Sequence, residues 1–393
     1  MPGLLKLRHV QELQGTRGQV QGICEGALIR FRDVDRLLIV STLILLAIGV
    51  VMVYSTSSVV ALKRFGDQYF FVRKHLTFAV AGVVFFVLAA RVPYGFYRKM
   101  AYPILALAAV FLICIYIPGI GFSAGGAKRW IRLGPLAFQP SEPAKLAVIF
   151  FLAYSLAGKA ERIKNFSTGF LPNMLFPGIV ILLIVMEPDL GTAVTLAAIV
   201  ILMNFAAGAR LRHLLALGLA VLPFLYLLMT NFRYMITRLQ IFLDPWKDPE
   251  GKGFQMIQSF LAFGSGGIDG VGLGEGRQKL FFLPEAHTDF ILSVIGEELG
   301  FLGVAVVIAF YAIFLYSGTR IALKAKDLHG TYLALGLTFM VVLQAAINMA
   351  VVMGLLPPKG LPLPFISYGG TSLVVNMIAV GVILNICIRE NEA

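Results

Sequence analysis

Charged residues are scarce in this chain of 393 residues. Asp, Glu, Lys and Arg make up 14% of it, whereas soluble domains carry roughly a quarter. So few polar side chains could not cover a soluble core of this size. The apolar residues, 58% of the chain, instead form long blocks separated by short charged clusters. This pattern is typical of a helical membrane protein, because a run of about 20 apolar residues is needed to cross the hydrocarbon.

Several functional signatures are also missing. The three cysteines, Cys24, Cys114 and Cys387, are too far apart to indicate a disulfide framework or a zinc site. Walker, Gly-x-Ser-x-Gly and dinucleotide motifs are absent from the sequence. The first 36 residues are basic but lack an apolar core with a cleavage site, which indicates a cytoplasmic tail and not a signal peptide. The net charge of +12 is explained by anionic lipid and basic loops between spans, so no nucleic acid partner is expected.

Ten apolar stretches have the length of transmembrane helices. They lie near residues 37–57, 75–90, 101–118, 142–158, 171–186, 190–207, 212–229, 289–317, 331–354 and 368–388. Because a helix satisfies its own backbone in lipid, we expect an all-α, polytopic membrane bundle of about ten helices. The sequence thus divides into a cytoplasmic tail (1–36), a transmembrane domain (37–388) and a second cytoplasmic tail (389–393). A large outer loop, 230–288, joins the seventh and eighth helices.

The distribution of Lys and Arg predicts the orientation. The N-terminal tail, the C-terminus and every second short loop between spans hold 18 of them, and the opposite short loops hold eight. Basic loops remain in the cytoplasm, so both termini are expected there. The connections 118–141, 187–189, 230–288 and 355–367 then face outward, and the chain is expected to be a multi-pass protein of the bacterial inner membrane.

The segment from Leu283 to Phe290 runs directly into an apolar helix. Asp289 lies at the expected water–lipid boundary, where apolar surroundings raise the pKa of a carboxylate and make it a better proton acceptor at neutral pH. The alternative is that Thr288 or Asp289 only caps the helix. Glu297 and Glu298, farther along the same helix, are either functional carboxylates within a span or a buried, hydrogen-bonded structural pair.

A second cluster combines basic residues with a tryptophan. Lys128 and Arg129 could hold a diphosphate through charge-assisted hydrogen bonds, beside Trp130 at the lipid interface. Glu142 and Lys145 lie three residues apart on one helical face. Lys145 therefore either pairs with Glu142 or binds a substrate phosphate.

Two further clusters lie on the same expected face. Glu187 and Asp189, in a tight turn between spans, could bind a divalent cation such as Mg or Mn together with an anionic substrate, or the turn only caps the next helix. The Pro- and Gly-rich segment 357–372 predicts either a broken segment that lines a polar cavity or a rigid loop. Its Lys359, Ser367 and Tyr368 are candidate substrate-binding residues.

These stretches together resemble the SEDS family (shape, elongation, division and sporulation). The resemblance covers nearly the whole expected transmembrane region, in the family's order: Gly126–Ile131, Gln139–Glu142, Glu187–Thr192, Pro284–Ile291, Gly296–Gly300 and Leu363–Ser372. Lys-Arg-Trp-Ile and Pro-Glu-Ala-His-Thr-Asp-Phe-Ile look more like the division branch, FtsW, than the elongation branch, RodA. The residues before 33 match nothing in the family, and Pro143 replaces its usual non-proline residue.

The resemblance implies a peptidoglycan glycosyltransferase that polymerises lipid II into glycan strands at the division septum. Asp289 would be its catalytic residue. The residues that would bind substrate are Lys128, Arg129, Lys145, Lys359, Glu142, His287, Ser367 and Tyr368. It also implies a class B penicillin-binding transpeptidase and other division proteins as partners. No nucleotide is needed, because the donor is already activated. The same features leave open a lipid II flippase or a non-catalytic division scaffold that recruits the transpeptidase.

Overall fold

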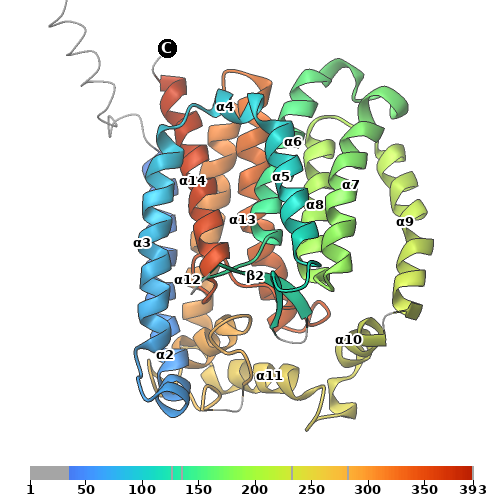
Figure 1. The fold of residues 1–393 in the computed structure, drawn as a ribbon. Helices are drawn as coiled ribbons and strands as arrows, with labels where there is room; N and C mark the ends of the chain where they lie inside the picture. Colours follow the sequence, from blue (N-terminus) through green and yellow to red (C-terminus); the bar gives the residue numbers. More distant parts are fainter. Residues whose placement is uncertain (1–34, 125–126, 134–135, 232, 281–282, 392–393) are drawn as a thin grey trace, which may run out of the picture.

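Ten long helices form the body of the part of the chain that the computed structural model describes, residues 35–124, 127–133, 136–231, 233–280 and 283–391 (Figure 1). They are α2 (Arg36–Phe65), α3 (Phe70–Arg91), α5 (Ala101–Cys114), α6 (Ser141–Gly158), α7 (Leu171–Met186), α8 (Leu190–Ala206), α9 (Leu211–Asn231), α12 (Ile291–Lys324), α13 (Leu328–Val352) and α14 (Gly370–Asn391). Each helix falls on one of the ten apolar stretches, which confirms the predicted bundle. Within the described residues, six segments are individually long and apolar enough to cross a membrane, those of α2, α3, α7, α12, α13 and α14.

Both ends of the described chain lie at one end of the bundle (Figure 1). Asp35 caps α2 there and pairs with Arg320 at the far end of α12, with 4.0 Å between Arg320 Nη1 and Asp35 Oδ2. Lys326 donates a hydrogen bond to the carbonyl of Arg389 in α14 (2.7 Å). The short helices α4 (Tyr94–Lys99), η1 (Ala160–Arg162) and η2 (Phe166–Phe170) connect the long helices at this same end.

The opposite end carries a small sheet and two further helices (Figure 1). Strands β1 (Gly121–Ala124), β2 (Ala127–Leu133) and β3 (Leu136–Phe138) pair antiparallel in the order β1-β2-β3. Beside them lie α10 (Arg233–Leu243), η3 (Pro245–Lys247) and α11 (Phe254–Gly266). The all-α prediction omits the sheet, because strands of three to seven residues are too short to leave a clear periodic signal.

The apolar run near 289–317 predicts one continuous helix, but α12 is interrupted at Gly300, whose φ of 64° lies in the left-handed region. The Gly-rich loop after α11 pairs with the backbone groups freed by the break. The amide of Val271 donates to the carbonyl of Glu297 (3.0 Å), and the amide of Phe301 donates to the carbonyl of Gly267 (2.9 Å). An unpaired backbone group buried away from water costs several kcal/mol in lipid, and the hydrogen bonds from this loop avoid that cost. The connection between α9 and α12 therefore packs against the bundle over part of its length.

Candidate active site

A cavity of about 550 Å³ lies at the end of the bundle that carries the sheet, and its wall comes from stretches far apart in the sequence. It brings together five of the candidate catalytic and substrate-binding residues: Arg129, Glu142, Asp289, Lys359 and Tyr368. The polar residues that also line it, and to which the sequence analysis assigns no role, include Arg238, Lys252, Gln255 and Glu285. Arg238 could have been found from the sequence, because it is a basic residue in the amphipathic pattern of α10, within a connection that is expected to face outward.

Asp289 lies directly before α12, on the wall of this cavity. The structure does not support the alternative that Thr288 or Asp289 caps the helix, because the N-cap is Phe290 and no side chain bonds to the first turn. The hydroxyl of Thr288 instead donates to the carboxylate of Glu285 (2.9 Å). Among the described residues, no group donates a hydrogen bond to the Asp289 carboxylate, so both its oxygens are available to a substrate.

The surroundings of Asp289 favour a neutral carboxyl group. Removal from bulk water is the largest cause, followed by the charges of Glu285 and Asp189, and together they raise the pKa of Asp289 to about 7. The guanidinium groups of Arg129 and Arg238 oppose this rise. A carboxylate with such a pKa is ionised in part at neutral pH and is a stronger base than an ordinary aspartate.

The segment after α13 holds the opposite wall against Asp289. The side-chain amide of Asn348 donates to the backbone carbonyl of Asp289 (2.8 Å) and to that of Leu361 (2.7 Å). It thereby fixes the segment around Asp289 relative to the segment around Leu361. Gly360 lies so close that a Cβ there would stand 2.9 Å from Asp289 Oδ2. Lys359 lines the cavity beside it, and burial together with the charge of Arg238 lowers the pKa of its ammonium group. The segment thus lines a polar cavity, as one of the two predictions for it required.

Arg129 is held in place by the turn between α7 and α8. Its Nε donates to the carbonyl of Glu187 (3.2 Å), and its Nη2 donates to the carbonyl of Pro188. Its guanidinium also lies 4.0 Å from the Asp189 carboxylate. Lys128, its neighbour in β2, does not line the cavity, because successive side chains of a strand point to opposite faces.

The surroundings of Asp189 and Glu187 do not favour the predicted metal site. Asp189 caps α8 by accepting from the amide (3.2 Å) and the hydroxyl (2.9 Å) of Thr192, which was the alternative for this turn. Glu187 is buried, and its carboxylate has no hydrogen-bond partner within the described residues. Burial first, and then the charge of Asp189, raise the pKa of Glu187 to about 9. A carboxyl group protonated at neutral pH is a poor ligand, and the described part of the chain holds no group of three or more His, Cys, Asp or Glu residues arranged for a metal ion.

Three other expected substrate-binding residues, Lys145, Ser367 and His287, do not line the cavity and make contacts within the protein instead. The ammonium of Lys145, wholly buried, contacts the carboxylate of Glu142 (2.9 Å) and the amide oxygen of Gln344 (2.6 Å), so it forms the structural pair and does not line the cavity. Ser367 accepts a hydrogen bond from the amide of Leu363 (2.8 Å) within its own loop. The ring of His287 packs between aromatic rings, and burial lowers the pKa of its imidazole.

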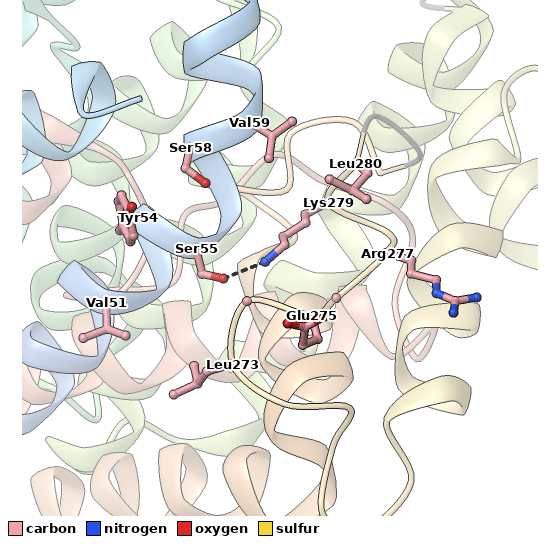
Figure 2. Close-up of a pocket in the computed structure, with 12 residues that line it drawn as sticks. Val51, Tyr54, Ser55, Ser58, Val59, Leu273, Glu275, Arg277, Lys279 and Leu280 are labelled. Carbon is pink, nitrogen blue, oxygen red and sulfur yellow. Dashed lines mark hydrogen bonds between the residues drawn. The ribbon is translucent and has the colours of Figure 1, made fainter. Parts of the chain in front are cut away.

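Glu297 and Glu298 anchor the Gly-rich loop. Glu298 accepts hydrogen bonds from Lys279 (2.6 Å), from Ser55 of α2 (2.7 Å) and from the amide of Gly274 (3.1 Å). Figure 2 shows Lys279 directed toward Ser55 across a separate pocket between α2 and the loop. Glu297 accepts from the amides of residues 277 and 278. The structural alternative for these two carboxylates is therefore the one that the structure adopts.

The chain is similar to known proteins. The family model described as "Cell cycle protein", of the FtsW/RodA/SpoVE type, matches residues 35–392. The probable peptidoglycan glycosyltransferase FtsW of Geobacter metallireducens is 50% identical over 355 residues, which cover 90% of this chain and 95% of that protein. Stage V sporulation protein E of Bacillus subtilis is 43% identical over 352 residues, 90% of this chain and 96% of that protein.

Two solved structures have the same fold. One, described as showing structural coordination of polymerization and crosslinking by a peptidoglycan synthase complex, matches with a TM-score of 0.74 and 29% identity over 92% of this chain and 99% of that one. The rod shape determining protein RodA of Thermus thermophilus matches with a TM-score of 0.67 and 25% identity over 90% of this chain and 96% of that one. The family match over nearly all the described residues and the close FtsW relative place this chain in the FtsW/RodA/SpoVE family of multi-pass membrane proteins.

Proposed function

We propose that this chain is a peptidoglycan glycosyltransferase that polymerises lipid II, with Asp289 as the general base. One observation carries the proposal: the carboxylate of Asp289, with a pKa of about 7 and no partner among the described residues, faces a cavity whose wall also holds four cations. They are Arg129, Arg238, Lys252 and Lys359. The names of the relatives and the shared fold agree with this activity.

The reaction follows from these groups. Asp289 removes the proton from the 4-hydroxyl of the acceptor's N-acetylglucosamine as that oxygen attacks the anomeric carbon of the donor's N-acetylmuramic acid. The new glycosidic bond forms with inversion, and the bond to undecaprenyl diphosphate breaks. Negative charge grows on the departing diphosphate, and fixed cations that face this charge lower the barrier. Arg129 is one of these cations, and the turn between α7 and α8 fixes its position.

Glu187 and Asp189 do not fit a metal ion that stays bound to the protein, so no step of the proposed reaction is assigned to such an ion. A Mg²⁺ or Mn²⁺ ion that arrives with the diphosphate is still part of the proposal. Such ions often use one or two carboxylates and fill the other positions with phosphate oxygens and water. Glu142 and Glu285 are the glutamates on the cavity wall.

We further propose that the end with the cavity faces outward and that both termini are cytoplasmic. The excess of Lys and Arg in the loops at the opposite end supports this orientation. A class B penicillin-binding transpeptidase is the proposed partner, at the division septum with other division proteins. The similarity to a peptidoglycan synthase complex in which polymerization and crosslinking are coordinated supports such a partner.

The test is polymerisation of lipid II by the purified full-length chain, alone and with its transpeptidase. Asp289→Asn should lower the rate about 10²- to 10⁴-fold, the usual effect of removing a positioned base. The matched control is Asp269→Asn, the same change at an exposed position outside the cavity, which should leave the rate unchanged. A flippase would move lipid II across vesicles without forming glycan. Normal polymerisation by Asp289→Asn would refute the assignment.

A further inference from the structure

A second cavity, of about 340 Å³, adjoins the active-site cavity. Its wall is formed by the end of α10, by η3 and by the turn that follows. Ile241 and Lys252 line both cavities, so the two spaces lie on either side of the same two side chains. A ligand held in the active-site cavity therefore has a direct neighbour space for any group that projects past them.

The helical geometry of α10 explains this division. Thr237, Gln240 and Ile241 lie three and four residues apart, on one face of the helix, and line the second cavity. Arg238 projects about 100° around the helix from Thr237 and lines the active-site cavity instead. Ile241 lies at the boundary between these two directions, so a single helix separates the cavities.

The second cavity carries charges of both signs. Its wall includes the carboxylates of Asp244 and Asp248 and the ammonium groups of Lys247 and Lys252. The contact between Asp244 and Lys247 is long, 3.9 Å, Lys247 is exposed and Asp244 is half-buried, so the pair is a weak one and both charges can act on a ligand. Asp248 accepts the amide of Lys252 through Oδ2 (3.0 Å), and its Oδ1 has no partner among the described residues.

The charges on this wall indicate which part of the substrate the second cavity fits. A diphosphate favours a wall that is positive in sum, and a polyprenyl chain favours an apolar one. Separate carboxylates and ammonium groups match a ligand that itself carries both amine and carboxylate groups. The short peptide on the N-acetylmuramic acid of lipid II is the part of the substrate with that chemistry.

We propose that this second cavity is a subsite for the peptide arm of lipid II, with Asp244 and Asp248 facing its amine and Lys247 facing a carboxylate. The proposal rests on the proposed function, since it requires lipid II sugars in the neighbouring cavity. A volume of about 340 Å³ is at the lower end of the range for ligand pockets, roughly 300–1,000 Å³, so the subsite holds part of the peptide.

The experiment compares two substrates on the full-length chain with its transpeptidase. One is lipid II with a peptide that has a free side-chain amine, and the other is the same lipid-linked disaccharide without peptide. The wild type should use the peptide-bearing substrate with a kcat/KM about tenfold higher, as expected for one or two charge-assisted contacts. The double variant Asp244→Asn/Asp248→Asn should lose that preference through a higher KM.

The variants are chosen to keep the fold intact. Asp244 and Asp248 accept amide hydrogen bonds that shape the loop, and an asparagine oxygen accepts the same bonds without the charge. Glu250→Gln is the control, because it removes a charge from an exposed position in the same loop outside the cavity. The thermal unfolding midpoint of each variant should equal that of the wild type.

Three results would overturn the subsite. The first two are a wild type that uses both substrates equally and a double variant that retains the preference for peptide. Equal loss of activity on both substrates would also overturn it, because a peptide subsite cannot affect a substrate without peptide. The proposed function is tested separately by Asp289→Asn, so polymerisation that depends on Asp289 but not on the peptide would remove the subsite alone.

Discussion

Glu285→Gln should move the acid limb of the pH–rate profile of lipid II polymerisation toward lower pH. The charge of Glu285 is the second-largest cause, after burial, of the rise in the pKa of Asp289 from 3.8 to about 7. Removal of that charge leaves burial in place, so the pKa should fall by about one unit. The glutamine oxygen can still accept the hydrogen bond from Thr288, so the local geometry is retained.

The sign of the effect follows from the proposed role of Asp289 as a base. The base acts only when ionised, so the rate rises with pH up to the pKa and then levels off. At pH 6, about a tenth of the molecules carry the ionised base if the pKa is 7, and about half if it is 6. A base with a lower pKa is also weaker, so the plateau above pH 8 should fall by about threefold. The midpoint of the acid limb is therefore the quantity to measure, not the rate at a single pH.

The assay is the initial rate of glycan formation between pH 5 and 9 at lipid II concentrations well below KM, where the rate reports the pKa of the free enzyme. Glu250→Gln, the same change at an exposed site outside the cavity, should leave the midpoint where it is in the wild type. A midpoint that does not move in Glu285→Gln, or that moves to higher pH, would show that the measured acid limb does not report Asp289 as the structure describes it.

Three further outcomes are expected. Lys279→Met should destabilise the protein by about 3 kcal/mol, since it leaves the Glu298 carboxylate buried without its cation, and the double variant with Glu298→Gln should recover part of the loss in a thermal unfolding assay. Gly360→Ala should lower kcat about tenfold or more with little change in the unfolding midpoint, because its methyl group would press on the Asp289 carboxylate; unchanged kinetics would refute this contact. A chelator should abolish polymerisation reversibly if a divalent ion travels with the diphosphate, and full activity in excess EDTA would exclude that part of the proposal.

The sequence predicted the helices and singled out Asp289, the proposed base, because both depend on local features. An apolar run of about 20 residues must become a transmembrane helix wherever it occurs, which is why all ten expected stretches carry long helices. Asp289 stood out because it ends a polar motif directly before an apolar helix. The choice between base and helix cap, however, required the backbone at Phe290 and the positions of the neighbouring donors.

Contacts between distant segments decided the remaining features of the site. Lys145 and Lys359 are both lysines near an apolar boundary, yet α13 supplies a buried partner to the first and the cavity wall includes the second. Arg238 and Glu285 come from the long connection before α12, whose path depends on packing against the helix broken at Gly300. Composition and periodicity describe neighbours along the chain, so they determined which segments cross the membrane and which residues could act. Which of those side chains meet in one cavity was decided by tertiary structure, because burial and hydrogen-bond partners come from residues that are far apart in the sequence, 58 positions for Arg129 and Glu187 and 199 for Lys145 and Gln344.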